Sequence, residues 1–302
     1  YDLVKECTAN GALEIVWSRP FKPFPEPEPT FWDDHVPYQK LSDHKKVESL
    51  THRLAWSQSQ FLHGEQGALL VASQLTSCAP TFNAKLYAAS QTFDEARHVE
   101  AFNKYIQTRT KMMYPIGNAL KSILDKILTD PRWDLKFIGM QVIIEGLALA
   151  AFQASRDLTK DPVFRDMLGL IIRDEARHVT FGINYLEEFV DTLTEQEKED
   201  RAQFAYEACW LSRERLVSME VFEHFGMDAE EARQFQLSSD ITQLFQKLLF
   251  SRVMPNLRRI GLLRDSVKHK FEDLGILEYA SAQSDAHIDW ADLSRPLFEE
   301  TA

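Results

Sequence analysis

Residues 94–98 read DEARH, and the same five letters return at residues 174–178. A glutamate precedes each copy at the same distance: Glu65 lies before the first and Glu145 before the second, in the pattern Glu-x28-DEARH. The two copies therefore place four glutamates and two histidines in matched positions: Glu65, Glu95, His98, Glu145, Glu175 and His178. This doubled pattern determines what fold and what chemistry we expect.

The spacing inside the first copy predicts a helical hairpin. Pro80 ends the helix that carries Glu65, since proline lacks the backbone N–H that a helix interior needs. The stretch from Glu65 to Pro80 is roughly 22 Å of helix, and the stretch from Thr81 to Glu95 is roughly 21 Å. If the chain reverses at Pro80, the two glutamates arrive at the same height on antiparallel helices.

The second copy repeats this arithmetic. The stretch from Glu145 to Lys160 is as long as that from Glu65 to Pro80, and the stretch from Asp161 to Glu175 matches the returning helix of the first copy. Asp161 and Pro162 are typical of a helix start, as N-cap and first helical residue. In each DEARH the Glu and the His share one helix face. Two such hairpins, packed about a pseudo-two-fold axis, bring all six side chains to one level of a four-helix bundle.

The six residue types suit a pair of metal ions. Carboxylates bridge hard cations, and one imidazole per metal is a ligand that suits iron. One Glu from each of two helices and Glu-x-x-His from each of the other two is the ligand scheme of di-iron and di-manganese bundles. The alternative is a buried salt-bridge network built on Arg97 and Arg177. Residues 142–152 are apolar on every face apart from Glu145, so a bare carboxylate would be costly there.

The doubled Glu-x28-DEARH pattern resembles that of the ferritin-like di-iron carboxylate oxygenases. These include the hydroxylase subunits of bacterial multicomponent monooxygenases and the p-aminobenzoate N-oxygenase type. The resemblance covers roughly residues 41–225. It implies two iron ions (Fe/Fe, with Mn/Fe as an alternative), O2 as co-substrate, and hydroxylation or N-oxygenation of a mostly apolar small organic molecule. The chain has no cluster or nucleotide-binding signature, so electrons would come from a ferredoxin or a reductase.

The resemblance also implies roles for individual residues. The catalytic carboxylates would be the four glutamates, with Glu95 and Glu175 bridging the metals. Asp94 and Asp174 would accept hydrogen bonds from the histidine nitrogens that do not face the metals, across the pseudo-symmetry, and Arg97 and Arg177 would keep those aspartates ionised. One position departs from the N-oxygenase type, which carries a further His ligand where this chain has Ile171.

Two other functions use the same ligands. A radical-generating or Mn/Fe cofactor scaffold, like the small subunit of ribonucleotide reductase, would serve a partner enzyme. Such subunits have a tyrosine at the position of Phe102 and often Asp at that of Glu65. An iron-oxidising or storage protein is the third candidate, but the long part of the chain after Val190 exceeds what a minimal storage bundle needs.

Small residues next to Glu65 and Glu145 leave volume near the expected metals. Gly64, Gly67 and Gly146 are the glycines among them. Close helix packing explains these small residues equally well. If the volume is a substrate pocket, we expect six residues to line it: Leu62, Gln66, Leu69, Val142, Leu149 and Phe152.

Composition and charge limit which other classes of protein the chain can belong to. The chain has 302 residues, 44% of them hydrophobic, which allows a large helical core. The net charge is −12 and no basic stripe is present, so we expect no nucleic-acid partner. No apolar run approaches the length of a membrane span. Three widely spaced cysteines, Cys7, Cys78 and Cys209, are typical of reduced thiols in the cytoplasm.

Strand signals are nearly absent, so the fold class is all-α, with a ferritin-like four-helix bundle, an internal repeat and additional C-terminal helices. Residues 1–40 read as an extended proline-rich arm, because six of the twelve prolines lie at positions 20–37. This arm would drape over the bundle or reach a second subunit of a homodimer. Residues 41–280 form the helical domain, and residues 281–302 an irregular tail. The expected helices are 42–78, 81–111, 115–129, 131–158, 162–191, 194–225, 229–236, 240–253 and 255–263.

Overall fold

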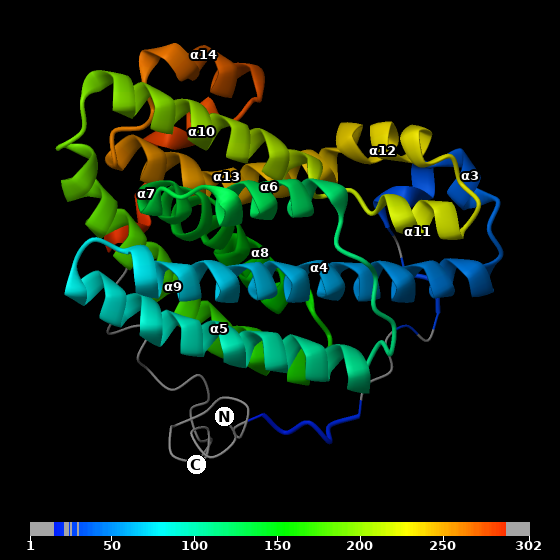
Figure 1. The fold of residues 1–302 in the computed structure, drawn as a ribbon. Helices are drawn as coiled ribbons and strands as arrows, with labels where there is room; N and C mark the ends of the chain where they lie inside the picture. The colour runs from blue at the N-terminus through cyan, green and yellow to red at the C-terminus, as the bar shows by residue number, and fades with distance from the viewer. Residues whose placement is uncertain (1–14, 21–23, 25, 29, 288–302) are drawn as a thin grey trace.

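Four long helical rods make up the bundle, and Figure 1 shows how they lie. The computed structural model describes residues 15–20, 24, 26–28 and 30–287, and within them it contains helices and no strand. Among these residues the all-α prediction is confirmed. The rods are, in chain order, α4 (Asp43–Cys78), α5 (Phe82–Thr108), a composite third rod made of α7 (Trp133–Phe137), η2 (Ile138–Ile144) and α8 (Glu145–Leu158), and α9 (Pro162–Val190).

The rods pair as two antiparallel hairpins, because short turns connect α4 to α5 and α8 to α9. Local sequence determines where the returning helices begin. The Thr81 hydroxyl accepts a hydrogen bond from the Ala84 N–H at 3.2 Å. The Asp161 carboxylate accepts one from the Val163 N–H at 2.9 Å, and Pro162 follows as the first helical residue. These caps satisfy N–H groups that have no partner inside the helix.

The third rod contains a π-helical segment, η2, directly before Glu145. Every residue of this segment is buried. A π-helix bonds each N–H to the carbonyl five residues earlier and is rare, so it changes the direction of the side chains that follow it. Here it leads directly into the ligand candidate Glu145.

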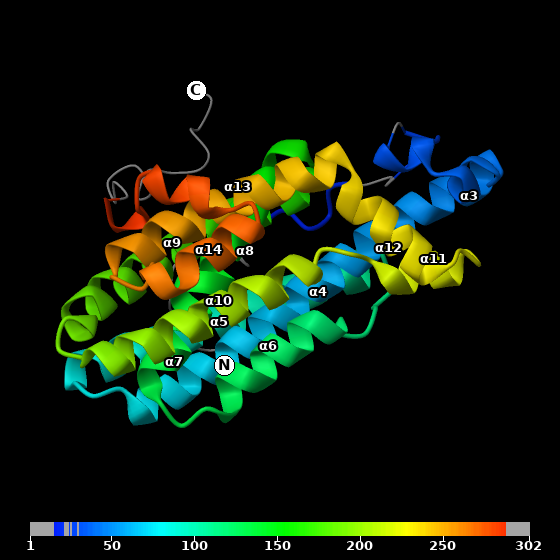
Figure 2. The same cartoon turned by 90° about the horizontal axis from the view of Figure 1, so that it is seen from above.

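Further helices cover one side of the bundle and one end of it (Figure 2). Helices α6, α10 and α13 pack against the third rod and α14 packs on α10, whereas α11 and α12 lie at the end of the molecule where α4 begins. The bounds of these helices are α6 Asn118–Thr129, α10 Glu195–Glu214, α11 Met219–His224, α12 Ala229–Ser238, α13 Asp240–Arg259 and α14 Asp265–Asp273, with the 3-10 turns η3 at Leu277–Ser281 and η4 at Asp285–His287.

The third rod is long and apolar enough to cross a membrane, with a mean hydropathy of 1.7 over its most apolar 18-residue window. That window is entirely buried inside the protein, between α9 and the covering helices. Burial on all sides explains why its sequence shows no polar face. It is the core helix of the bundle.

The described part of the N-terminal arm packs on the outer helices. It includes η1 (Phe31–Asp34) and α3 (Val36–Gln39). Trp32 is only 1% exposed, and its ring lies 4.2 Å from that of Phe222 and 5.4 Å from that of Phe235. At the other end, the stretch we expected to be irregular from residue 281 begins with the packed turn η4, and residues 288–302 lie outside the described residues.

Candidate metal centre

The six repeated side chains meet in the interior of the bundle. Each rod contributes at the same level: Glu65 from α4, Glu95 and His98 from α5, Glu145 from α8, and Glu175 and His178 from α9. All six are at most 5% exposed. The antiparallel turns bring side chains from distant parts of the sequence into contact, as the hairpin arithmetic requires.

Their oxygen and nitrogen atoms form two overlapping groups of four. One group contains Glu65, Glu95, His98 and Glu175, and the other contains Glu95, Glu145, Glu175 and His178. Within each group, one atom from each side chain lies within 4.8 Å of the others. Glu95 and Glu175 belong to both groups. The geometry therefore offers two adjacent cation positions that share two carboxylates.

Each histidine turns Nδ1 toward the glutamates. Nδ1 of His98 lies 3.1 Å from Glu65 Oε2 and 3.1 Å from Glu175 Oε1. Nδ1 of His178 lies 3.2 Å from Glu95 Oε1. One nitrogen of each ring is thus available to a cation held by the carboxylates.

The other nitrogen of each ring faces an aspartate from the opposite repeat. Nε2 of His98 lies 3.2 Å from Asp174 Oδ2, and Nε2 of His178 lies 3.3 Å from Asp94 Oδ2. A carboxylate partner of this kind holds the ring with Nε2 protonated and raises the basicity of Nδ1. Because α5 and α9 exchange these contacts, each histidine depends on the other hairpin for its orientation.

Two arginines link the aspartates into a ring of charges. Arg97 donates to Asp94 and, at 3.1 Å, to Asp174. Arg177 donates to Asp174 and, at 3.4 Å, to Asp94. Burial would raise the pKa of Asp174, but the hydrogen bond from His98 and the two guanidinium groups lower it overall. The pKa of Asp94 is lowered in the same way, with His178 as its partner.

Inside this ring, the four glutamates form no ion pair with a lysine or an arginine of the described residues, and only His98 and His178 lie close enough to pair with them. Burial and the neighbouring carboxylates raise the pKa of Glu65 and of Glu145 well above the usual range. Burial lowers the pKa of His98 and His178, but their hydrogen bonds to the surrounding carboxylates raise it well above 6.5 overall. In the metal-free protein, protons therefore take the place of cations.

The residues present fit a pair of divalent ions. Among the described residues, no well-directed hydrogen bond reaches the buried Oε2 atoms of Glu95, Glu145 and Glu175 or the buried Nδ1 of His178, although this Nδ1 lies 3.2 Å from Glu95 Oε1. Buried polar atoms without partners are rare in native proteins and need an explanation. Two dications balance four ionised glutamates with neutral imidazoles. Carboxylate oxygen and imidazole nitrogen are donors that iron accepts.

Sequence reasoning missed Gln91, which lies one turn before Glu95 and is 1% exposed. Its amide donates to Glu145 Oε1 at 2.7 Å and to Glu95 Oε1 at 3.3 Å. Gln141, in the π-helical segment, donates to Gln91 Oε1 at 3.2 Å. The matching position of the second repeat is Ile171, which is buried in an apolar cluster. A comparison of the two repeats position by position shows a polar Gln91 where the other repeat has the apolar Ile171. This difference is the sequence signal that could have identified Gln91.

The six residues expected to line a pocket occupy different environments. Phe152 lines a small cavity of about 20 Å³ that also contacts Glu65, Glu145 and Glu175. Leu62, Val142 and Leu149 are buried in the apolar packing, Gln66 is exposed and bonded to His63, and Leu69 is half-buried. None of these five lines the cavities next to the glutamates. Gly67 and Gly146 face Leu124 and Val253, so close packing explains these two glycines.

A larger cavity of about 700 Å³ adjoins the small one. The two cavities share Gln60, Phe61 and Arg215 in their walls. Aliphatic and aromatic residues form much of the larger cavity. Three polar atoms of its lining residues are buried without a hydrogen-bond partner among the described residues: Ser212 Oγ, Arg215 Nη1 and Gln236 Oε1. Burial lowers the pKa of Arg215 to about 10, which leaves it charged at neutral pH.

Comparison with known proteins assigns the chain to a family. A search of curated proteins finds no match. A family model described as p-aminobenzoate N-oxygenase AurF matches residues 6–261, which include all four rods and every residue of the candidate centre. This match covers most of the chain. The chain therefore belongs to the p-aminobenzoate N-oxygenase AurF family, whose members are O2-dependent di-iron oxygenases.

Proposed function

We propose that the protein uses O2 to N-oxygenate a small organic amine that has a mostly apolar body and also carries an anionic group. The family's description supports the reaction type and names a carboxylated aryl amine as substrate. The observation that carries the substrate class is Arg215, a partly buried cation without an ion pair in the described chain. Its Nη1 is buried without a hydrogen-bond partner there, and the residue lies in the wall shared by the two cavities. Hydroxylation of a carbon atom in the same cavity is the second candidate.

In this proposal the six repeated residues hold two iron ions. Glu65 and His98 would bind one ion, Glu145 and His178 the other, and Glu95 and Glu175 would bridge them, since the last two belong to both groups. When bound, the iron pair supplies the O2-binding position and the electron transfer that the organic residues lack. Mn/Fe is an alternative pair, because these ligands discriminate weakly between the two metals.

The side chains around the cavity would bind and orient the substrate. The guanidinium of Arg215 and the hydroxyl of Ser212 donate hydrogen bonds to the anionic group, and such charge-assisted bonds are strong in a buried site. Phe61 and Leu147 contact the apolar body. The amine then points along the small cavity toward Glu65, Glu145 and Glu175. The apolar lining limits access of water to this path.

The reaction needs electrons from outside the chain. Conversion of an amine to a hydroxylamine by O2 takes up two electrons and two protons and releases one water. The sequence contains no cluster or nucleotide-binding signature, so we propose a ferredoxin or a reductase as donor. Cys78 and Cys209 are free thiols, which is consistent with a reducing cytoplasmic location. A homodimer is part of the proposal, with the N-terminal arm as a candidate contact.

The test combines metal analysis with a substrate pair. The iron-loaded protein, supplied with a reductant and O2, is given p-aminobenzoate and the uncharged amine aniline, and products are identified by mass spectrometry. We expect N-oxygenated product from the carboxylated amine. Arg215→Gln should lower its kcat/KM by about tenfold to a hundredfold, since a buried charge-assisted hydrogen bond contributes about 1.5–3 kcal/mol. The value for aniline should change little.

Arg213→Gln is the matched control, because Arg213 lies close to Arg215 in the chain but lines neither cavity. An equal loss with both amines, or the same loss in the control, would contradict the role of Arg215.

Oxygen insertion only at carbon would favour hydroxylation. A long-lived radical without product would favour the cofactor scaffold, and many iron atoms per chain would favour storage. Neither alternative is better supported by the family match than the oxygenase.

A further inference from the structure

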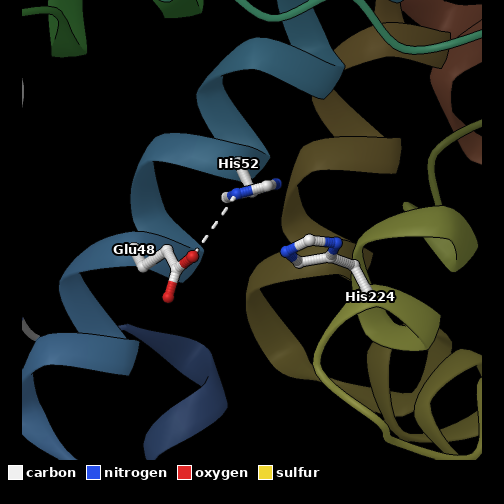
Figure 3. Close-up of side chains that lie close together, drawn as sticks. All are labelled: Glu48, His52 and His224. Atoms are coloured by element: carbon white, nitrogen blue, oxygen red, sulfur yellow. Dashed lines mark ion pairs between the residues drawn. The ribbon is translucent and has the colours of Figure 1, made fainter.

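A second cluster of metal-binding side chain types lies outside the bundle interior (Figure 3). Glu48 and His52 are one turn apart on α4, and His224 is the last residue of α11. His52 Nε2 lies 4.0 Å from Glu48 Oε1. One potential ligand atom from each of the three residues lies within 4.8 Å of the other two. Figure 3 shows the three side chains converging on one space between the two helices.

The orientation of His52 favours a cation in that space. Its Nδ1 lies 2.5 Å from the Tyr114 hydroxyl, while its Nε2 faces Glu48. Ligating histidines characteristically use one ring nitrogen for the metal and hold the other in a hydrogen bond. If Nδ1 donates to the phenol oxygen, the lone pair of Nε2 is directed at the cluster. His224 stacks on His52 with ring centroids 4.2 Å apart, which places a second imidazole beside it.

We propose that Glu48, His52 and His224 form a second metal site, for a borderline divalent cation such as Zn²⁺, which ties α11 to α4. Two imidazoles and one carboxylate form a ligand set that zinc uses, at metal–ligand distances of about 2.0–2.2 Å. Because the two rings are stacked, one imidazole has to turn so that a nitrogen of each ring faces the same cation. His224 is exposed, so water occupies the remaining positions.

This site is separate from the di-iron centre. The stretch of α4 from His52 to Glu65 is roughly 20 Å of continuous helix. No residue is common to the two sites. The new site therefore differs in location and in ligands, since it has two histidines for one cation and no bridging carboxylate.

The cation would secure the wall of the cavity region. Helix α11 is short, and its Glu220 accepts a hydrogen bond from Trp56 Nε1 of α4 at 2.8 Å. Trp56 and Ser218, which precedes α11, both line the 700 Å³ cavity. A metal bond from His224 to α4 adds a second attachment at the other end of α11. Occupancy would thus hold this short helix beside the cavity.

The experiment uses the full-length protein with its di-iron centre loaded first, so that zinc does not compete for the glutamates. Zinc is titrated by calorimetry, and iron and zinc per chain are measured after desalting. We expect one zinc in addition to two irons. His52→Ala and His224→Ala should each weaken zinc binding at least about tenfold while iron content stays the same, which also shows that the variants fold. Glu48→Gln should also weaken zinc binding.

His269→Ala is the control, because His269 is an exposed histidine of α14 outside the cluster. It should bind zinc as the unmodified chain does. A second readout is the unfolding temperature, which zinc should raise in the unmodified chain and in the control but not in His224→Ala. Absence of the additional zinc, zinc that only displaces iron, or binding that survives in both histidine variants would overturn the proposal.

Discussion

Asp94 and Asp174 determine which nitrogen of each histidine faces the glutamates. Each aspartate reaches across to the histidine of the other repeat, and each is held by the same pair of arginines. This explains why each repeat contains an aspartate and an arginine besides the ligand candidates. A change at one aspartate acts on a histidine 76 or 84 positions away.

Asp174→Asn tests this dependence. The amide keeps the shape of the side chain but is a weaker partner for the Nε2–H of His98, so the ring loses both its fixed tautomer and basicity. We expect Fe(II) affinity to fall by about tenfold to a hundredfold. The measurement is anaerobic Fe(II) titration. Asp166→Asn is the control, because Asp166 lies on the same helix but pairs with Arg19 away from the centre; a loss of equal size there would contradict the prediction.

The protons that occupy the metal-free centre predict a pH dependence of stability. His98 and His178 have raised folded-state pKa values, so their stabilising contribution is complete below the unfolded value of about 6.5 and is lost as pH rises through the folded values. Glu65 and Glu145 act in the same direction. We expect the unfolding temperature of the metal-free protein to fall as pH rises above neutral.

Calorimetry at a series of pH values, with and without two irons per chain, measures this effect. Iron should remove most of the fall, since the cations replace the protons. The lowered pKa values of Asp94, Glu95 and Asp174 act oppositely, so their stabilisation is lost as pH falls into the acidic range. A metal-free protein whose stability stays constant or rises above neutral pH would contradict the assignment of the buried protons.

At the scale of elements, the π-helical segment and α9 approach each other closely. A Cβ at Gly182 of α9 would lie 2.5 Å from the Cβ of Gln141, so only glycine fits. Gln141 in turn donates to Gln91, which holds Glu145. The glycine therefore allows the close contact on which this chain of amide hydrogen bonds depends.

Gly182→Ala should lower the free energy of unfolding by about 1–3 kcal/mol, because neither backbone can move without disturbing the packed core. Gly64→Ala is the matched control within α4. A Cβ there meets nothing within 4 Å, and alanine favours helix over glycine by up to about 1 kcal/mol. Chemical denaturation measures the free energy of unfolding of both variants. Equal effects would show that the contact with Gln141 is unimportant.

Two stretches of the chain divide into helices differently from the sequence prediction. We predicted a break between residues 253 and 255, and this was wrong: α13 continues through Pro255. Proline has no backbone N–H, so the helix lacks one hydrogen bond there. Pro255 and both its neighbours are buried, and their tertiary packing offsets the loss. Conversely, the single helix predicted from residue 194 to 225 ends at Glu214 and resumes at Met219. The turn between them carries Arg215 to the cavities.

At the scale of the whole molecule, the segment at η4 joins α9 to α13. Asp285 is 2% exposed and accepts hydrogen bonds from Arg252 and from Asn256 Nδ2, the latter at 3.0 Å. Its carbonyl accepts another from the Thr180 hydroxyl at 3.0 Å. This segment thus fastens the covering layer to the bundle.

Asp285→Ala should lower the free energy of unfolding by about 1–3 kcal/mol, since it removes the carboxylate that accepts hydrogen bonds from Arg252 and from Asn256 Nδ2. The expected loss is below that for a fully buried ion pair because Arg252 is 32% exposed and water screens it. Thermal unfolding measures the loss. Asp265→Ala, which removes only a surface pair with Lys268, should change stability little. Equal stability of both variants would contradict this role.

The sequence by itself determined the all-α class, the two hairpins and the level at which their six side chains meet. These features could be predicted because the rise per residue of a helix is constant and because the same Glu-to-DEARH spacing occurs in both copies. The helix start at Asp161 and Pro162 was equally predictable, since a cap depends on neighbouring residues.

Only the tertiary structure decided what surrounds the six side chains. Gln91 and Arg215 became visible as parts of the site when helices distant in sequence packed together. Of the six expected pocket residues, Phe152 lines the small cavity, whereas Leu62, Val142 and Leu149 are enclosed in apolar packing. The pairing of each histidine with the opposite aspartate was first implied by resemblance, and the coordinates give its geometry. The physical reason is the same in each case: helix periodicity is a local property of the chain, whereas cavities and unpaired buried groups arise from contacts between distant segments.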